Sequence, residues 1–194
     1  MSTDGADRRS AILDAAIDLL ATKGLPGVTH RSVDEAAGLP EGSCSYYFGK
    51  KTALLIAAAE RLGDRIEQSC AEARRHFADL VAEGKLKEAT AFMAQDLVDD
   101  ADDGKILLLA RFELSFAGLR TPELKPAADR LESAARAPVA FVMKLLTKTA
   151  REEDVDACMG VIDGLALRYA TGQAPRPTVR QISRLLRSIP GEKG

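Results

Sequence analysis

The chain has 194 residues, 46% apolar and 29% charged, which is the balance of an ordinary folded protein. No apolar run reaches the roughly 18 to 20 residues of a membrane span, and the N-terminus lacks the apolar core of a signal peptide. Three widely spaced cysteines indicate neither a disulfide framework nor a zinc site, so we expect a cytoplasmic protein with no membrane segment, cofactor or metal.

Charge by itself does not indicate a nucleic-acid partner. The net charge is −2, and the first 65 residues carry eight Lys and Arg against nine Asp and Glu. Any interaction with DNA must therefore depend on where the cations lie.

Apolar residues recur at helical spacing through most of the chain, and strand signals are nearly absent, which predicts an all-α fold. The first helix is expected at about 8–23, where Gly24 ends it. Two short helices should follow, one after the N-cap Thr29 and one at 41–47, with a turn beginning at Gly38. A longer helix is expected at about 51–77.

Five further helices are predicted beyond the long one, at about 86–99, 104–118, 123–150, 154–172 and 178–188. The break before the second of these falls at residues 102–104. Pro138 lies inside the third and is expected to kink or split it, because proline removes a backbone donor and clashes with the preceding turn.

Residues 29–47 have the pattern of a helix-turn-helix, in which the second helix enters the DNA major groove. We expect a small apolar face on the first helix, formed by Val33, Ala36 and Ala37, to seat the second. Gly38 permits the turn, and the small residues 42–45 give the second helix a narrow outer face. Cations for phosphate contacts are available nearby in Arg31, Lys50 and Lys51.

Residues 8–54 resemble the DNA-binding domain of the TetR family of transcriptional repressors. The matching features are the Ile12/Ala16/Leu19/Leu20 stripe ending at Gly24, Val28-Thr29, Val33, Ala36-Ala37-Gly38-Leu39, Gly42-Ser43, Tyr46-Tyr47-Phe48, Lys51 and Leu54. The resemblance implies a three-helix DNA-binding domain at 8–52 and a helical ligand-binding and dimerisation domain at 53–190. The stretch 161–167 resembles the late dimerisation helix of the family.

The resemblance also assigns DNA contacts by position. Thr29, Arg31, Tyr47 and Lys51 would meet phosphates, with Arg31 able to reach a base. The positions that read the major groove are Pro40, Glu41, Gly42, Ser43, Ser45 and Tyr46. Glu41 could accept from cytosine N4 or could cap the helix. The second helix contains no Lys or Arg, so specificity would come from small polar groups, DNA shape and a dimer.

The resemblance also makes Phe48 a core residue that fixes the angle between the motif and the long helix. It makes Cys44 a small buried residue, with a redox sensor as the alternative. In the second domain, a subset of the bulky apolar residues would line an effector cavity, the rest being core. The candidates are Phe77, Phe92, Met93, Phe112, Phe116, Phe141 and Tyr169. Arg111 and Glu113 are either polar anchors for the effector or exposed.

The helices at about 123–150 and 154–172 are expected to form a four-helix dimer interface, with the contact residues on the helix at 154–172. Five residues recur at helical spacing there and include small side chains that allow close approach: Ala157, Val161, Gly164, Leu165 and Arg168.

These features predict a ligand-responsive transcriptional regulator, most simply a repressor, that binds a palindromic operator as a homodimer. Its partners would be double-stranded DNA and a small apolar or amphipathic effector that releases it. One alternative is an interaction module or antagonist that does not bind DNA. A helical enzyme is the other, but the two histidines are isolated and no phosphate loop or paired metal motif is present.

Overall fold

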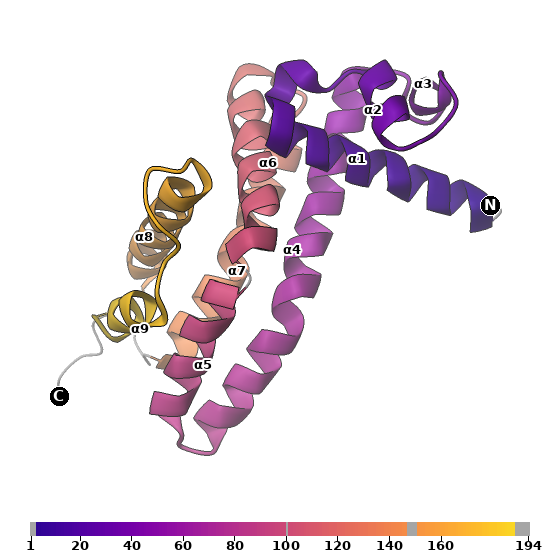
Figure 1. Cartoon of the computed structure of the whole chain (residues 1–194). Helices are drawn as coiled ribbons and strands as arrows, with labels where there is room; N and C mark the ends of the chain where they lie inside the picture. Colours follow the sequence, from indigo (N-terminus) through magenta and orange to yellow (C-terminus); the bar gives the residue numbers. More distant parts are fainter. Residues whose placement is uncertain (1–2, 100, 147–150, 189–194) are drawn as a thin grey trace. The chain divides into compact units, whose positions relative to one another are not determined.

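The computed structural model describes residues 3–99, 101–146 and 151–188, and within these ranges it contains nine helices and no strand (Figure 1). The expected all-α fold is confirmed. The helices are α1 (Thr3–Gly27), α2 (His30–Ala36), α3 (Ser43–Phe48), α4 (Lys51–Ala82), α5 (Leu86–Asp99), α6 (Ala101–Arg120), α7 (Lys125–Leu146), α8 (Glu152–Ala170) and α9 (Val179–Ser188).

Several boundaries differ from the sequence-based expectation. The break at 102–104 is wrong, because α6 already begins at Ala101 and includes Gly104. One glycine lowers helix stability by only about 1 kcal/mol, which tertiary packing can offset. Helix α7 is not split at Pro138, and α4 continues to Ala82. The expected end of the α7 segment at 147–150 lies outside the described residues.

The chain forms two compact units, one of residues 1–65 and 106–133 and one of residues 66–105 and 134–194. Helices α4, α6 and α7 therefore contribute to both units. In the first unit, α1 packs on α2 and α2 on α3. Its buried side chains include Ile12, Leu20, Val33, Phe48 and Leu54, so the inward stripe of α1 and the expected core role of Phe48 are confirmed.

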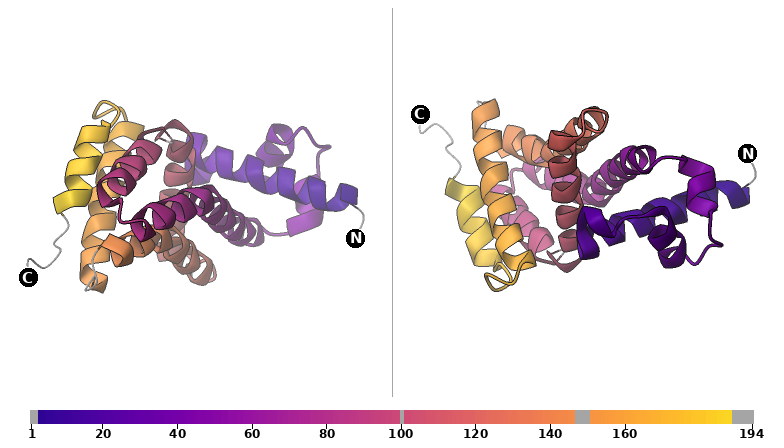
Figure 2. Two further views of the ribbon diagram at one scale, coloured as in Figure 1. Left: turned by 90° about the horizontal axis from the view of Figure 1, so that it is seen from below. Right: turned by 90° about the horizontal axis from the view of Figure 1, so that it is seen from above.

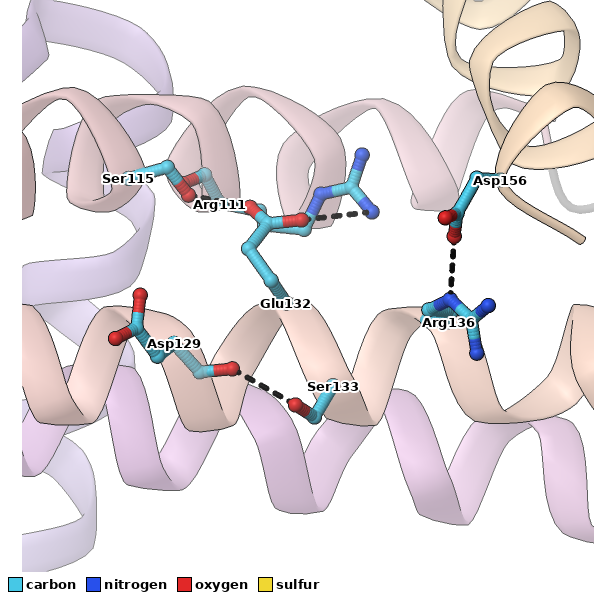
Figure 3. Close-up of polar contacts among 7 residues, drawn as sticks. All are labelled: Arg111, Ser115, Asp129, Glu132, Ser133, Arg136 and Asp156. Carbon is cyan, nitrogen blue, oxygen red and sulfur yellow. Dashed lines mark hydrogen bonds and ion pairs between the residues drawn. The ribbon is translucent and has the colours of Figure 1, made fainter. Parts of the chain in front are cut away.

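The second unit has its own apolar core, with Phe77, Met93, Val142 and Ile182 among its buried members. Helix α5 packs against α9 (Figure 1), and α8 and α9 lie side by side (Figure 2). Arg136 of α7 connects to α8, since its Nε lies 2.7 Å from an Asp156 carboxylate oxygen (Figure 3). Among the described residues, no helix is both long enough and apolar enough to cross a bilayer.

Candidate DNA-binding and effector sites

Helix α2 begins with a capping box formed by Thr29 and Ser32. The Thr29 hydroxyl accepts the Ser32 N–H at 3.1 Å, and the Ser32 hydroxyl accepts the Thr29 N–H at 2.9 Å. Ser32 Oγ also donates to the Gly27 carbonyl at 2.8 Å. The start of α2 is thereby fixed to the turn that precedes it.

The buried face of α2 differs from the one expected. Val33 is fully buried, but Ala36 is exposed and Ala37 only partly covered, so the proposed Val33/Ala36/Ala37 seat is wrong at Ala36. Instead, Asp34 is buried on α2 together with Val33, and the exposed fraction of Asp34 is only 2%. A short turn follows α2, and Gly38 adopts a φ of +65° in it, as glycine allows.

Asp34 caps the second helix of the motif. Its carboxylate accepts the N–H of Gly42 at 2.8 Å and that of Cys44 at 2.7 Å, at the start of α3. Gly42 is the N-cap residue and has no side chain to offer, so a neighbouring helix supplies the cap. A negative charge at this end also complements the helix dipole. The capping interpretation of Glu41 is therefore wrong, because Glu41 is exposed in the turn before α3.

The outer face of α3 is small and polar except for one aromatic ring. Tyr46 is 84% exposed, and Ser45, Gly42, Glu41 and Pro40 are exposed as well. The Ser43 hydroxyl donates to the Pro40 carbonyl at 2.6 Å, which leaves its oxygen free to accept. The Tyr47 ring is partly buried and lies edge-on to Tyr46, with 5.3 Å between the ring centroids.

Cys44 is buried. Its thiol pKa is raised to about 11, mainly by this burial and to a smaller extent by the charge of Asp34. We expect Cys44 to resist iodoacetamide at pH 8 in the folded protein, since the thiolate is the reactive form. The protonated thiol contributes its full stability below pH 9.0, the ordinary value, and that contribution declines as the pH rises towards 11. Peptide mass spectrometry after brief alkylation measures how far iodoacetamide modifies Cys44, with the partly exposed Cys70 as internal reference. Equal modification of the two thiols would contradict the prediction.

Three cations expected to contact phosphate, Arg31, Lys50 and Lys51, are all exposed. Lys51 begins α4, and its Nζ donates to the Leu25 carbonyl at 2.8 Å, with two further N–H donors on the ammonium. The contact of Arg9 with Phe48 was not predicted from the sequence. The guanidinium carbon of Arg9 lies 5.3 Å from the centroid of the Phe48 ring. Arg9 and Phe48 are 39 positions apart, and no local pattern connects them.

Arg111 and Glu113 have structural partners within the first unit. Arg111 is only 3% exposed, and Figure 3 shows its guanidinium facing Glu132 of α7, with 3.9 Å between the charged atoms. Ser115 donates to the same Glu132 carboxylate. Glu113 accepts the backbone N–H of Leu25 at 2.8 Å. The expectation of an exposed Arg111 is therefore wrong.

The second unit contains an apolar cavity of about 90 Å³ among α4, α5, α7 and α8. Its lining comprises Cys70, Ala73, Arg74, Met93, Asp96, Leu97, Pro138, Val139, Val142, Met143, Cys158 and Ile162. Ligand pockets usually measure roughly 300 to 1,000 Å³, so side chains would have to move to admit a larger molecule. Met93 and Met143 are unbranched and adapt readily.

Of the seven side chains expected at an effector site, Met93 lines this cavity. Phe77, Phe92 and Phe141 belong to the nearby core cluster, and His76 covers Phe92 edge-on with 4.5 Å between ring centroids. Phe112 and Phe116 stack on each other in the first unit, and Tyr169 is partly buried on α8. Spacing along one helix could not reveal which residues of four different helices converge.

Helix α8 leaves the expected dimerisation face uncovered in the single chain. Ala157, Gly164 and Arg168 are exposed, Val161 is 45% exposed, and only Leu165 packs partly against the core. Gly160 lies on the same face, and a Cβ at Gly160 or Gly164 would meet no atom within 4 Å. Small residues therefore make this face flat and open.

A capped helix-turn-helix with an exposed second helix, joined to a helical unit, defines the class of DNA-binding transcriptional regulators. Residues 12–58 match the model of the bacterial regulatory proteins of the TetR family, and residues 85–189 match that of the tetracyclin repressor-like C-terminal domain. The chain belongs to the TetR family, whose members are regulators and not enzymes.

Known proteins of similar sequence and fold agree with this assignment. The chain is 30% identical to the HTH-type transcriptional regulator BetI of Burkholderia cenocepacia over 175 residues, 88% of this chain and 86% of that protein. A TetR-family structure from Streptomyces coelicolor A3 superposes with a TM-score of 0.67 at 25% identity, covering 94% and 98% of the two chains. The multidrug binding protein EbrR complexed with ethidium gives 0.66 at 25% identity, covering 95% and 98%.

Proposed function

We propose that this regulator is a repressor that binds a palindromic operator as a homodimer and is released by a small apolar or amphipathic effector. The observation that carries the proposal is the Asp34-capped α3, which presents a narrow polar face beside exposed cations. We keep 8–52 as the DNA-binding domain and 53–190 as the ligand-binding and dimerisation domain, and we place the protein's action in the cytoplasm.

The DNA contacts proposed from the sequence fit the exposure of the residues concerned. Tyr46 and Ser45 would read base edges, and Glu41 would accept from cytosine now that Asp34 accounts for the cap. Thr29, Arg31, Tyr47 and Lys51 would hold phosphates. Because α3 carries no cation, each half-site would bind weakly and the dimer would supply the affinity.

Lys51→Ala should weaken binding to every DNA sequence and lower the slope of log affinity against log salt by about 1, because one phosphate contact is lost. Fluorescence anisotropy on operator and random duplexes between 50 and roughly 200 mM salt measures both effects. Lys87→Ala, an exposed lysine on α5, is the matched control and should leave the slope unchanged. A variant that changed base preference at an unaltered salt slope would refute the phosphate assignment.

A homodimer would place two recognition helices in successive major grooves. The uncovered face of α8 supports this arrangement, because Ala157, Val161, Gly164 and Arg168 lie open and Leu165 is at its edge. Sedimentation at micromolar concentration tests it directly, and a monomeric chain that binds operator would count against it.

The apolar cavity of the second unit is the proposed effector site. Its walls are almost entirely apolar, with Arg74 and Asp96 as the charged members of the lining, which suits an amphipathic molecule. The similar protein EbrR has been crystallised with ethidium. Helix α4 carries the lining residues Cys70 and Ala73 and begins at Lys51, so its displacement would move the DNA-binding end. The effector must bind the released state more tightly for this to occur.

Val139→Trp should lower effector affinity at least about tenfold, because the indole fills the cavity, while operator affinity stays within about twofold. The assay is the shift in melting temperature produced by a panel of apolar and amphipathic compounds, ethidium included. Lys144→Trp, at an exposed position of α7, is the control. Ligand responses unchanged by Val139→Trp would place the effector elsewhere.

Selection of bound DNA from a random pool, repeated with that panel, tests the function as a whole. A palindromic consensus that is lost with one class of compound supports a ligand-released dimeric repressor. Failure to enrich any sequence would instead favour an interaction module that does not bind DNA.

A further inference from the structure

The last turn of α1, which follows the break at Gly24 and contains Leu25, is held by a residue far along the chain. Glu113 of α6 accepts the Leu25 N–H at 2.8 Å across 88 sequence positions, in a partly buried setting. A Cβ at Gly24 would lie 3.4 Å from the same carboxylate, so the contact is close.

The conformation of Gly24 makes this N–H available to a side chain. Gly24 has φ +66° and ψ 179°, which takes Leu25 out of the regular helical path. The Leu25 carbonyl, on the other side of the residue, accepts from Lys51 Nζ at 2.8 Å. Leu25 is therefore fixed by an anion from α6 on one side and by the cation at the start of α4 on the other.

Hydrogen bonds continue from this turn to the recognition helix. Ser32 of α2 donates to the Gly27 carbonyl at 2.8 Å, which ties α2 to the turn. Asp34, two residues further along α2, accepts from Gly42 and Cys44 and so fixes the start of α3. Val28 lies between this turn and the helix-turn-helix and is fully buried, so a displacement of the turn would disturb the packing of the core.

We propose that Glu113 is a positioning residue for DNA binding, which sets the orientation of α3 through the Leu25 turn, Ser32 and Asp34. The inference rests on the proposed DNA-binding function and adds a residue outside the helix-turn-helix to it. Loss of a hydrogen bond to a charged group at this point should weaken operator binding about tenfold.

The test compares Glu113→Met, which removes both acceptor oxygens at similar volume, with Glu113→Gln, which keeps one. Amide hydrogen exchange at Leu25, followed by NMR on the free protein, reports the contact without DNA. Anisotropy with the selected operator reports its consequence. We expect Glu113→Met to lose Leu25 protection and about tenfold in operator affinity, and Glu113→Gln to retain most of both.

Glu123→Met, a change at an exposed glutamate outside the contact, is the matched control and should alter neither readout. Circular dichroism establishes whether each variant is folded. If Glu113→Met is unfolded, the comparison with the wild-type protein uses Glu113→Gln, in which the Leu25 exchange rate and the operator affinity are measured together. An operator affinity unchanged by loss of Leu25 protection would overturn the inference alone. Failure of the wild-type protein to bind any DNA would overturn the proposed function and this role of Glu113 with it.

Discussion

Asp34→Ala is expected to lower the free energy of unfolding by about 2 to 4 kcal/mol and to abolish specific DNA binding, because one buried and one partly buried N–H group lose a charged acceptor. The groups are the amides of Gly42 and Cys44, at 2.8 and 2.7 Å from the carboxylate. Without this cap the first turn of a helix of only six residues has little to hold it in place. Chemical denaturation measures the stability, and anisotropy with the selected operator measures the binding.

Glu35→Ala provides the matched control, since the neighbouring carboxylate on α2 is exposed. Asp34→Asn separates shape from hydrogen bonding, because the amide presents an N–H to a backbone N–H and should recover only part of the loss. Wild-type stability in Asp34→Ala would show that water replaces the carboxylate, and the cap would then have no structural importance.

Gly42→Leu is expected to abolish specific DNA binding while leaving the chain folded, and two effects combine in it. Gly42 has a φ of +95°, where a side chain costs roughly 1 to 2 kcal/mol. A Cβ there meets no atom of the chain within 4 Å beyond its two neighbouring residues, so we expect the bulk of leucine to clash with the DNA rather than with the chain.

Gly42→Ala separates the two effects, because alanine brings the same backbone strain with little bulk. We expect similar losses of stability in both variants, measured by denaturation, and a far larger loss of operator affinity with leucine, measured by gel shift. Gly84→Leu carries comparable strain at φ +76° in the α4–α5 turn and should bind operator normally. Equal affinities for Gly42→Ala and Gly42→Leu would refute close approach of this residue to the groove.

Local patterns sufficed for the helical parts of this chain. The apolar stripe of α1 and the positive-φ glycines at 24 and 38 are readable because helix periodicity and glycine conformations depend on near neighbours. The break expected before α6 was wrong because it relied on a local glycine signal. Such a signal is weak where packing against distant residues supports the helix. The family resemblance, rather than spacing within α3, indicated correctly that Cys44 and Phe48 are buried.

The sequence by itself determined the all-helical fold, the helix-turn-helix and the TetR family, because these depend on residue types at fixed short spacing. The tertiary structure decided which groups meet: Asp34 with the start of α3, Glu113 with Leu25, and four helices around one cavity. The Glu113–Leu25 contact joins positions 88 residues apart, where the chain's own periodicity carries no information. Such contacts are set by the requirement that buried polar groups find partners and that apolar faces pack.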